Sequence, residues 1–148
     1  MLMPEQTAPC PLFRHRPSLS SQQPETFMIN PYREEERLEA MVSACYRATR
    51  SHFNHLPLKF IIAPPTHLMD AKLARQIGIV LLRCEFNVPR KRISKLLEIH
   101  RASVIQAIRT VERRRLEPMF DRAYERIASR AQDLFKTAMY EAAEQDVA

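Results

Sequence analysis

Apolar residues recur at helical spacing along most of the chain, and prolines separate the periodic segments. In the first segment, about residues 31–52, the spacing is that of one buried helical stripe, made by Leu38, Met41, Val42, Cys45 and Tyr46. Asn30 fits the N-cap of this helix and Pro31 its first position, where the missing N–H is not needed. The acidic run at residues 34–36 follows near the positive end of the helix dipole. The pattern predicts a packing helix.

A second helix is expected at about residues 71–86, with Asp70 as its N-cap. Apolar side chains occupy most of its circumference, namely Leu73, Ile77, Ile79, Val80, Leu81, Leu82 and Cys84. A helix that is apolar nearly all round is buried, so we expect it to be the central strut of the fold. Gly78 costs this helix about 1 kcal/mol of propensity, which indicates that another helix crosses closely there.

Two shorter helices follow and are joined by a tight turn. Pro89 begins the first, which ends near Leu97 and turns Ile93, Leu96 and Leu97 inward. A turn at residues 98–100 leads to a helix at about residues 102–116, with a core stripe of Val104, Ala107, Ile108 and Val111. Two helices of this length with so short a turn predict a helix-turn-helix at about residues 89–116. In that motif the second helix enters the DNA major groove and the first crosses the backbone.

Two segments lack this periodicity. Residues 1–29 are rich in Pro, Ser and Gln, which predicts a disordered arm. Residues 52–67 contain a short apolar run, Phe60-Ile61-Ile62, closed by Pro64-Pro65. Because the two prolines block a helix across that point, we expect a packed loop or an extended connector that holds the apolar run against the bundle.

Beyond Pro118 the pattern predicts a long amphipathic helix to about Glu144. Its stripe is narrow and rich in alanine: Phe120, Tyr124, Ile127, Ala131, Leu134, Phe135 and Ala138. Such a helix can fold back on the bundle or pair with a second copy of the chain. A homodimer through this helix would suit a DNA-binding protein, but the pattern leaves the choice open.

Together these elements predict an all-α fold, a small helical bundle that contains a helix-turn-helix and carries a long C-terminal helix and a disordered N-terminal arm. We expect the arm at residues 1–29, a helical DNA-binding domain at residues 30–117, and a packing or dimerisation helix at residues 118–148. A chain of 148 residues is long enough to bury a core without disulfides or a metal.

Positive charge is concentrated in the middle of the chain. Residues 71–115 contain twelve Lys or Arg and three Glu, a local charge of +9, whereas residues 1–70 have seven basic and seven acidic residues and residues 116–148 have four and seven. A field of one sign on a folded scaffold is typical of nucleic-acid binders. We expect DNA phosphates to be bound, without sequence reading, by Lys72, Arg75, Arg90, Lys91, Arg92, Lys95, Thr110 and Arg113.

Sequence reading requires side chains that donate or accept hydrogen bonds in pairs on the exposed face of the second helix. In the major groove, Arg pairs with guanine and Gln with adenine, each worth about 1–3 kcal/mol of discrimination. The candidate base-reading residues are Arg101, Ser103, Gln106 and Arg109. Their crowding on one motif favours double-stranded DNA over a merely solvated helix face.

Three stretches of the basic segment occur in the order found in a known DNA-binding family. They are Arg75-Gln76-Ile77 before an apolar helix, then residues 92–97 (RISKLL), then residues 103–112 (SVIQAIRTVE). In this order they resemble the C-terminal DNA-binding domain of the bacterial replication initiator DnaA, over about residues 71–116. The resemblance implies an all-helical, Trp-repressor-like fold with a helix-turn-helix, and double-stranded DNA as the partner.

Departures from the family limit what the resemblance implies. Where the family has Asp-His-Thr-Thr, this chain has His100-Arg101-Ala102-Ser103, one residue shorter across the turn, and it keeps Ser103, Gln106 and Arg109 at the family's Thr, His and Arg positions. The family's target sequence is therefore not carried over. Its basic minor-groove loop is replaced by residues 61–70 (IIAPPTHLMD). The glycines of a Walker loop are missing, so we expect neither an ATPase domain nor a bound nucleotide.

Several other chemistries find little support in the sequence. One glycine, Gly78, is too few for the tight hairpins of a β-rich fold or for a phosphate-cradling loop. Cys45 with His52 and His55 lacks the second ligand pair of a zinc site, so we expect no metal and no cofactor. His100 has no nucleophile or paired carboxylate near it in the pattern, so we expect no enzymatic activity.

Cysteine usage and hydropathy indicate where the protein resides. Cys10, Cys45 and Cys84 are odd in number and widely spaced, and the last two lie within apolar helical patterns, so we expect reduced, buried thiols. No run approaches the roughly 20 apolar residues of a transmembrane helix, and the N-terminus lacks the apolar core of a secretory signal. We therefore expect a cytoplasmic, nucleoid-associated protein without a membrane partner.

The residues leave more than one function open. The first expectation is a sequence-specific double-stranded DNA-binding protein that regulates transcription in bacteria. The alternative is a protein-interaction adaptor or a replication-control factor, which would use the C-terminal helix as an interface and the basic face to meet an acidic partner. RNA binding is weaker, because Phe86 is the only aromatic residue of the basic segment that could stack on a base.

Overall fold

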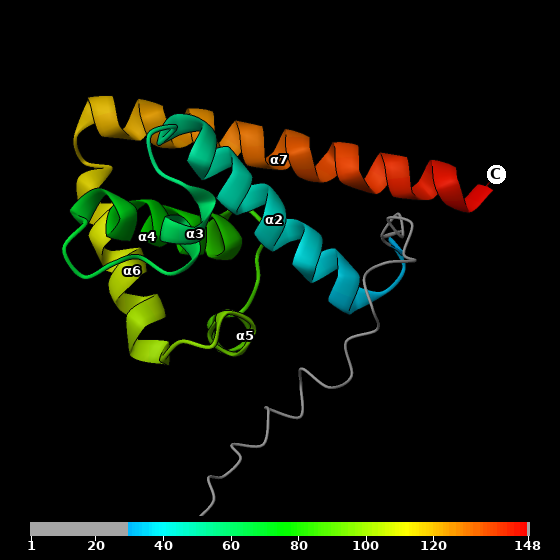
Figure 1. Cartoon of the computed structure of the whole chain (residues 1–148), viewed down its shortest axis with the longest axis horizontal. Helices are drawn as coiled ribbons and strands as arrows, with labels where there is room; N and C mark the ends of the chain where they lie inside the picture. The colour runs from blue at the N-terminus through cyan, green and yellow to red at the C-terminus, as the bar shows by residue number, and fades with distance from the viewer. Residues whose placement is uncertain (1–29, 148) are drawn as a thin grey trace, which may run out of the picture.

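The computed structural model describes residues 30–147, so the arm expected at residues 1–29 lies outside the described residues, as does Cys10. Within the described range the chain forms six helices and no strand (Figure 1). The helices are α2 (Glu34–His52), α3 (Leu58–Ile62), α4 (Met69–Cys84), α5 (Arg90–Leu97), α6 (Arg101–Arg114) and α7 (Pro118–Val147). The expected all-α fold with a long C-terminal helix is confirmed.

Helix α4 is the centre of the bundle, as its apolar circumference predicted. It contacts α2, α3, α5, α6 and α7, and its buried residues are Ala71, Ala74, Ile77, Gly78, Ile79, Val80, Leu81 and Leu82. The expected N-cap was wrong, since Leu68 takes that position and Asp70 lies in the first turn. The Leu68 N–H donates to the Pro65 carbonyl, and this turn starts the helix two residues early.

Helix α2 begins three residues later than expected, because Asn30 forms a turn instead of an N-cap. Its side-chain oxygen Oδ1 accepts a hydrogen bond from the Tyr32 N–H at 2.9 Å, and its carbonyl accepts one from the Arg33 N–H at 3.1 Å. The Asn30 N–H donates to the Glu36 carboxylate. The three glutamates at residues 34–36 still occupy the first helical turn, where the dipole favours them.

The segment expected to be a loop or an extended connector contains one helical turn, α3. Pro57 is its N-cap, with an extended backbone, and Ala63 ends it just before Pro64-Pro65. Ile61 is fully buried, whereas Ile62 is 48 % exposed. The interpretation was wrong because a short apolar run bounded by prolines fits either conformation. The expectation that no helix crosses Pro64-Pro65 is confirmed.

Helix α7 folds back along α2, and the two helices run in opposite directions, as Figure 1 shows. Alanine takes several buried positions on both helices: Ala40, Ala44 and Ala48 on α2, and Ala128, Ala131 and Ala142 on α7. Small side chains let two helices approach closely. Tyr124 and Ile127 are also buried on α7, whereas Phe120, Leu134, Phe135 and Ala138 of the predicted stripe are half-buried.

The two cysteines in the described range have different surroundings. Cys45 is buried in the core, but Cys84 is exposed, so the expectation of a buried thiol was wrong for Cys84. It is the last residue of α4. Gly78 lies against Tyr46 of α2, which confirms the expected close crossing.

Candidate nucleic-acid interface

Helix α5 is short and is anchored by one fully buried side chain. Asn87 adopts the left-handed conformation after α4, with φ 54°, which asparagine tolerates better than most residues. Val88 is buried, and Pro89 is the N-cap of α5. Ile93 has no exposed surface, so it fixes which face of α5 points to the core. The other face carries four exposed basic residues, Arg90, Lys91, Arg92 and Lys95.

A three-residue turn connects α5 to α6, as the sequence predicted. Glu98 adopts the left-handed conformation with φ 55° and ψ 46°, a conformation that usually selects glycine at a helix end. Ser94 makes two hydrogen bonds to Ile99 across the turn. Its carbonyl accepts one from the Ile99 N–H at 3.0 Å, and its hydroxyl donates one to the Ile99 carbonyl at 2.5 Å. The turn therefore sets α6 at a defined angle to α5.

One face of α6 packs on α4, and the opposite face is exposed to solvent. Val104, Ala107, Ile108 and Val111 are its buried residues, and α6 contacts both α4 and α5. Gln106, Arg109 and Arg113 are exposed and recur every three to four residues, so they form one line opposite the buried stripe. Arg101 and Ser103 are exposed in the first turn, and Thr110 is half-buried.

The exposed side chains of α5 and α6 form a surface that we call the α5–α6 face. It comprises Arg90, Lys91, Lys95, Arg101, Ser103, Gln106, Arg109 and Arg113. Among residues 30–147, the ion pairs involve none of its cations. The exception beside it is Arg92, whose Nη1 lies 2.9 Å from Oε1 of Glu34 at the start of α2. Positive charge on the face is therefore not neutralised by neighbouring carboxylates.

Two expected phosphate ligands are on α4 and not on the two helices of the α5–α6 face. Lys72 and Arg75 are half-buried on α4. Arg75 lines a pocket beside Tyr46 of α2, together with the end of α5. Sequence spacing alone grouped both residues with the basic segment, since it does not report how α5 and α6 pack on α4.

Arg115 belongs to the basic segment, but its guanidinium is paired with carboxylates of α7. Its Nε lies 2.6 Å from Oδ1 of Asp121, its Nη2 lies 2.6 Å from Oε1 of Glu125, and its guanidinium lies 4.1 Å from the ring centre of Tyr124. These contacts join the end of α6 to α7. Acidic residues just beyond Pro118 were the sequence signal for this pairing, and the sequence reasoning did not use it.

Ala102 is a further residue of the face that the sequence reasoning did not select. It is exposed in the first turn of α6, four residues before Gln106 and on the same line. A methyl group at this place can contact the methyl of thymine and leaves room for close approach. The four-residue spacing between Ala102 and Gln106 was the sequence signal that could have identified Ala102.

The part of the chain that the structure describes contains neither a metal-ligand cluster nor a membrane-spanning helix. No group of three His, Cys, Asp or Glu side chains among these residues could hold a metal ion. Cys45 is buried while His52 and His55 are exposed, so these three residues do not converge. None of the helices between residues 30 and 147 is long and apolar enough to cross a membrane.

Known proteins provide no assignment for this surface. Comparisons of the chain with models of protein families, with curated proteins and with solved structures found no match.

Proposed function

We propose that the chain is a sequence-specific double-stranded DNA-binding protein, a bacterial transcriptional regulator that acts at the nucleoid. In this proposal α5 and α6 are the two helices of a helix-turn-helix. Helix α6 enters the major groove, and α5 crosses the phosphate backbone beside it. The dimensions support this role, because the major groove of B-DNA admits one α-helix.

One observation carries the proposal: both helices of a tightly joined pair expose basic side chains that have no carboxylate partner among the described residues. Unpaired cations on a rigid surface repel one another unless an anion binds. Phosphates on a duplex supply such anions at regular spacing, and their neutralisation releases counterions. A merely solvated helix would more often carry mixed charge on its outer face.

Base reading is assigned to the exposed line of α6. Gln106 and Arg109 are three residues apart, which separates them by about 4.5 Å along the helix, close to the roughly 3.4 Å rise of one base pair. They can therefore address neighbouring base pairs, with Gln106 on adenine and Arg109 on guanine. Arg101 and Ser103 flank this line in the first turn and would contact the bases on either side.

Phosphate binding is assigned to the edges of the same face. Arg90, Lys91 and Lys95 on α5 would grip one strand, and Arg113 with Thr110 would contact the backbone near the end of α6. Arg92 can join them once it leaves Glu34. Lys72 and Arg75, which the sequence predicted as phosphate ligands, are not counted among the main ligands, because both are half-buried on α4.

The resemblance to the initiator's DNA-binding domain supports the same assignment. It also supports replication control as a variant of the proposal. In that variant the chain would occlude an origin without melting DNA, since its sequence contains no Walker loop. The adaptor alternative is weaker, because α7 packs on α2 and the middle of its apolar stripe, at Tyr124, Ile127 and Ala131, is buried.

Selection of bound duplexes from a random pool tests the proposal, followed by titration of the selected duplex and a scrambled one at several salt concentrations. We expect one recovered motif and a steep fall of affinity with salt. Recovery of no motif, with equal affinity for both duplexes, contradicts sequence-specific binding. Co-purification of an acidic protein without duplex binding would instead favour the adaptor.

A further inference from the structure

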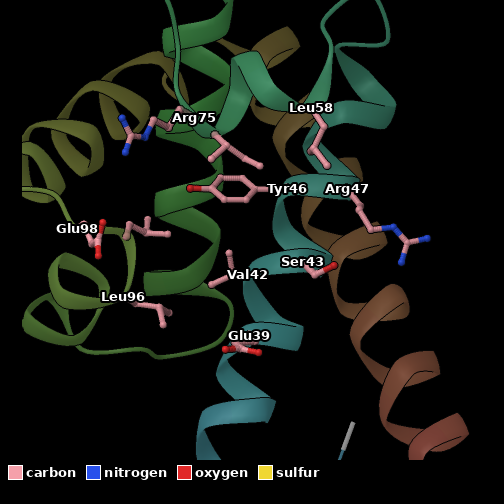
Figure 2. Close-up of a pocket in the computed structure, with 11 residues that line it drawn as sticks. Glu39, Val42, Ser43, Tyr46, Arg47, Leu58, Arg75, Leu96 and Glu98 are labelled. Atoms are coloured by element: carbon pink, nitrogen blue, oxygen red, sulfur yellow. The ribbon is translucent and has the colours of Figure 1, made fainter. Parts of the chain in front are cut away.

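A pocket of about 490 Å³ lies between α2, α3, α4 and the end of α5 (Figure 2). Its size is in the range of small-molecule sites, which is about 300–1,000 Å³. Most of the wall is apolar, with Val42, Leu58, Ile62, Leu96 and Leu97 around the ring of Tyr46. An apolar wall that four separate segments build accepts the body of a small organic molecule.

Arg75 gives this pocket a polar end. Its Nε–H is buried and has no hydrogen-bond acceptor, and none of the ion pairs between residues 30 and 147 includes Arg75. A buried donor without a partner costs about 1–3 kcal/mol, and more when it is charged. An acceptor supplied by a ligand would recover that cost, and a carboxylate matches the guanidinium best.

The hydroxyl of Tyr46 strengthens this end of the pocket. Burial raises the pKa of Tyr46 more than the neighbouring Arg75 guanidinium lowers it. The hydroxyl therefore stays protonated at neutral pH and can donate a hydrogen bond. Figure 2 shows the Tyr46 ring extending from α2 across the pocket, with Arg75 above it in that view.

The remaining charges of the wall are at its rim. Glu39, Arg47 and Glu98 are all exposed, and solvent screens exposed charges. In Figure 2, Glu39 lies at the lower end of the pocket and Arg75 at the upper end. The half-buried Arg75 is therefore the charge that a bound molecule would feel most strongly, and it selects an anion.

We propose that this pocket binds a small organic carboxylate with an apolar body, its carboxylate on Arg75 and Tyr46 and its body between Val42, Leu58 and Leu96. The site does not depend on DNA binding and is tested without a duplex. Leu97, the last residue of α5, and Glu98, the first residue of the turn before α6, both belong to the pocket wall. A bound molecule would therefore touch the segment that sets the angle of α6.

Titration of the full chain with phenylbutyrate tests the site, with phenylbutanol as a neutral probe of the same shape. We expect calorimetry to detect phenylbutyrate binding at millimolar concentration or below, at least about tenfold tighter than phenylbutanol. In wild-type protein the carboxylate should shift the NMR resonance of the Arg75 Nε–H, and the alcohol should not. Binding of neither probe, or equal affinity for both, overturns the proposal.

Substitutions distinguish the contribution of the Arg75 charge to binding from that of the apolar wall. Arg75→Gln should remove the preference for the carboxylate, Val42→Phe should block both probes, and Arg50→Gln, which changes an exposed arginine of α2 outside the pocket, should leave both affinities unchanged. Retained preference in Arg75→Gln, or its loss in Arg50→Gln, contradicts the assignment. If Arg75→Gln does not fold, as judged by circular dichroism, the wild-type resonance decides the outcome.

Discussion

Gly78 of α4 meets Tyr46 of α2 so closely that a Cβ built on the glycine would lie 2.9 Å from Cε1 and 3.0 Å from Cδ1 of the ring. The ring is buried, with 5 % of its residue surface exposed, so it cannot swing away into solvent. This contact sets the distance between α2 and α4. It thereby sets the width of the pocket and the support on which α6 rests.

Replacing Gly78 by Ala should lower the free energy of unfolding by about 1 kcal/mol. Alanine gains about 1 kcal/mol of helix propensity, but overpacking a core costs about 1–3 kcal/mol, and the buried ring leaves the new methyl no space. Chemical denaturation of the wild type and the variant measures the difference.

The double variant with Tyr46→Ala is the control for that prediction. Without the ring the methyl has room, so Gly78→Ala should stabilise the Tyr46→Ala protein by up to about 1 kcal/mol. A stabilising Gly78→Ala in the presence of Tyr46 would show that the crossing has more freedom than the contact implies.

Substitutions on the two helices of the α5–α6 face should affect DNA binding differently. Gln106→Ala should lower discrimination between duplexes by about 1–3 kcal/mol at one base pair. Lys91→Ala should weaken all duplexes alike and reduce the salt slope by about one. Fluorescence titrations at several salt concentrations measure both effects, and Lys136→Ala on α7 is the control. Unchanged binding in both α5–α6 variants would refute the assigned interface.

Glu34→Gln should raise duplex affinity, because it releases Arg92 from its 2.9 Å ion pair for a phosphate. The salt slope should steepen by about 0.9, while stability should fall by no more than about 1 kcal/mol. Glu35→Gln is a matched control in the same exposed turn, and Glu35 has no part in the ion pairs of the described residues. Equal effects of the two variants would mean that only net charge matters.

Glu98→Gly should raise the free energy of unfolding by about 1 kcal/mol. The left-handed conformation of Glu98 costs an L-residue roughly 1–2 kcal/mol, and glycine avoids most of this cost while losing some backbone entropy. Glu117→Gly provides the comparison, since Glu117 is in a turn without positive φ and should gain nothing. Denaturation midpoints at constant slope measure the effect, and a loss of stability in Glu98→Gly would contradict it.

Stability should fall above about pH 10, where tyrosines of the unfolded chain ionise. Burial raises the pKa of both Tyr46 and Tyr124 above 10.0 in the folded protein, so the folded state holds protons that the unfolded state loses. This contribution is complete below pH 10 and disappears as the pH rises. In a Tyr32→Phe/Tyr140→Phe variant, tyrosinate absorbance should appear together with loss of helical circular dichroism. Tyrosinate that forms before unfolding would contradict the prediction.

Much of the fold follows from local patterns. The stripe from Val104 to Val111 predicted the buried face of α6, and its complement correctly predicted that Gln106 and Arg109 are exposed. Ends of helices were less predictable, because Asn30 and Asp70 are good caps by residue type but neighbouring turns start the helices elsewhere. Residue type alone does not choose between competing local hydrogen bonds.

The sequence by itself determined which segments are helical, which face of each is apolar, and that positive charge gathers between residues 71 and 115. These properties depend on interactions over three or four residues. Only the tertiary structure decided that α7 packs on α2, that Arg92 meets Glu34, and that Arg75 lines a pocket beside Tyr46. Those outcomes depend on how whole helix surfaces interlock across distant parts of the chain, which local spacing does not encode.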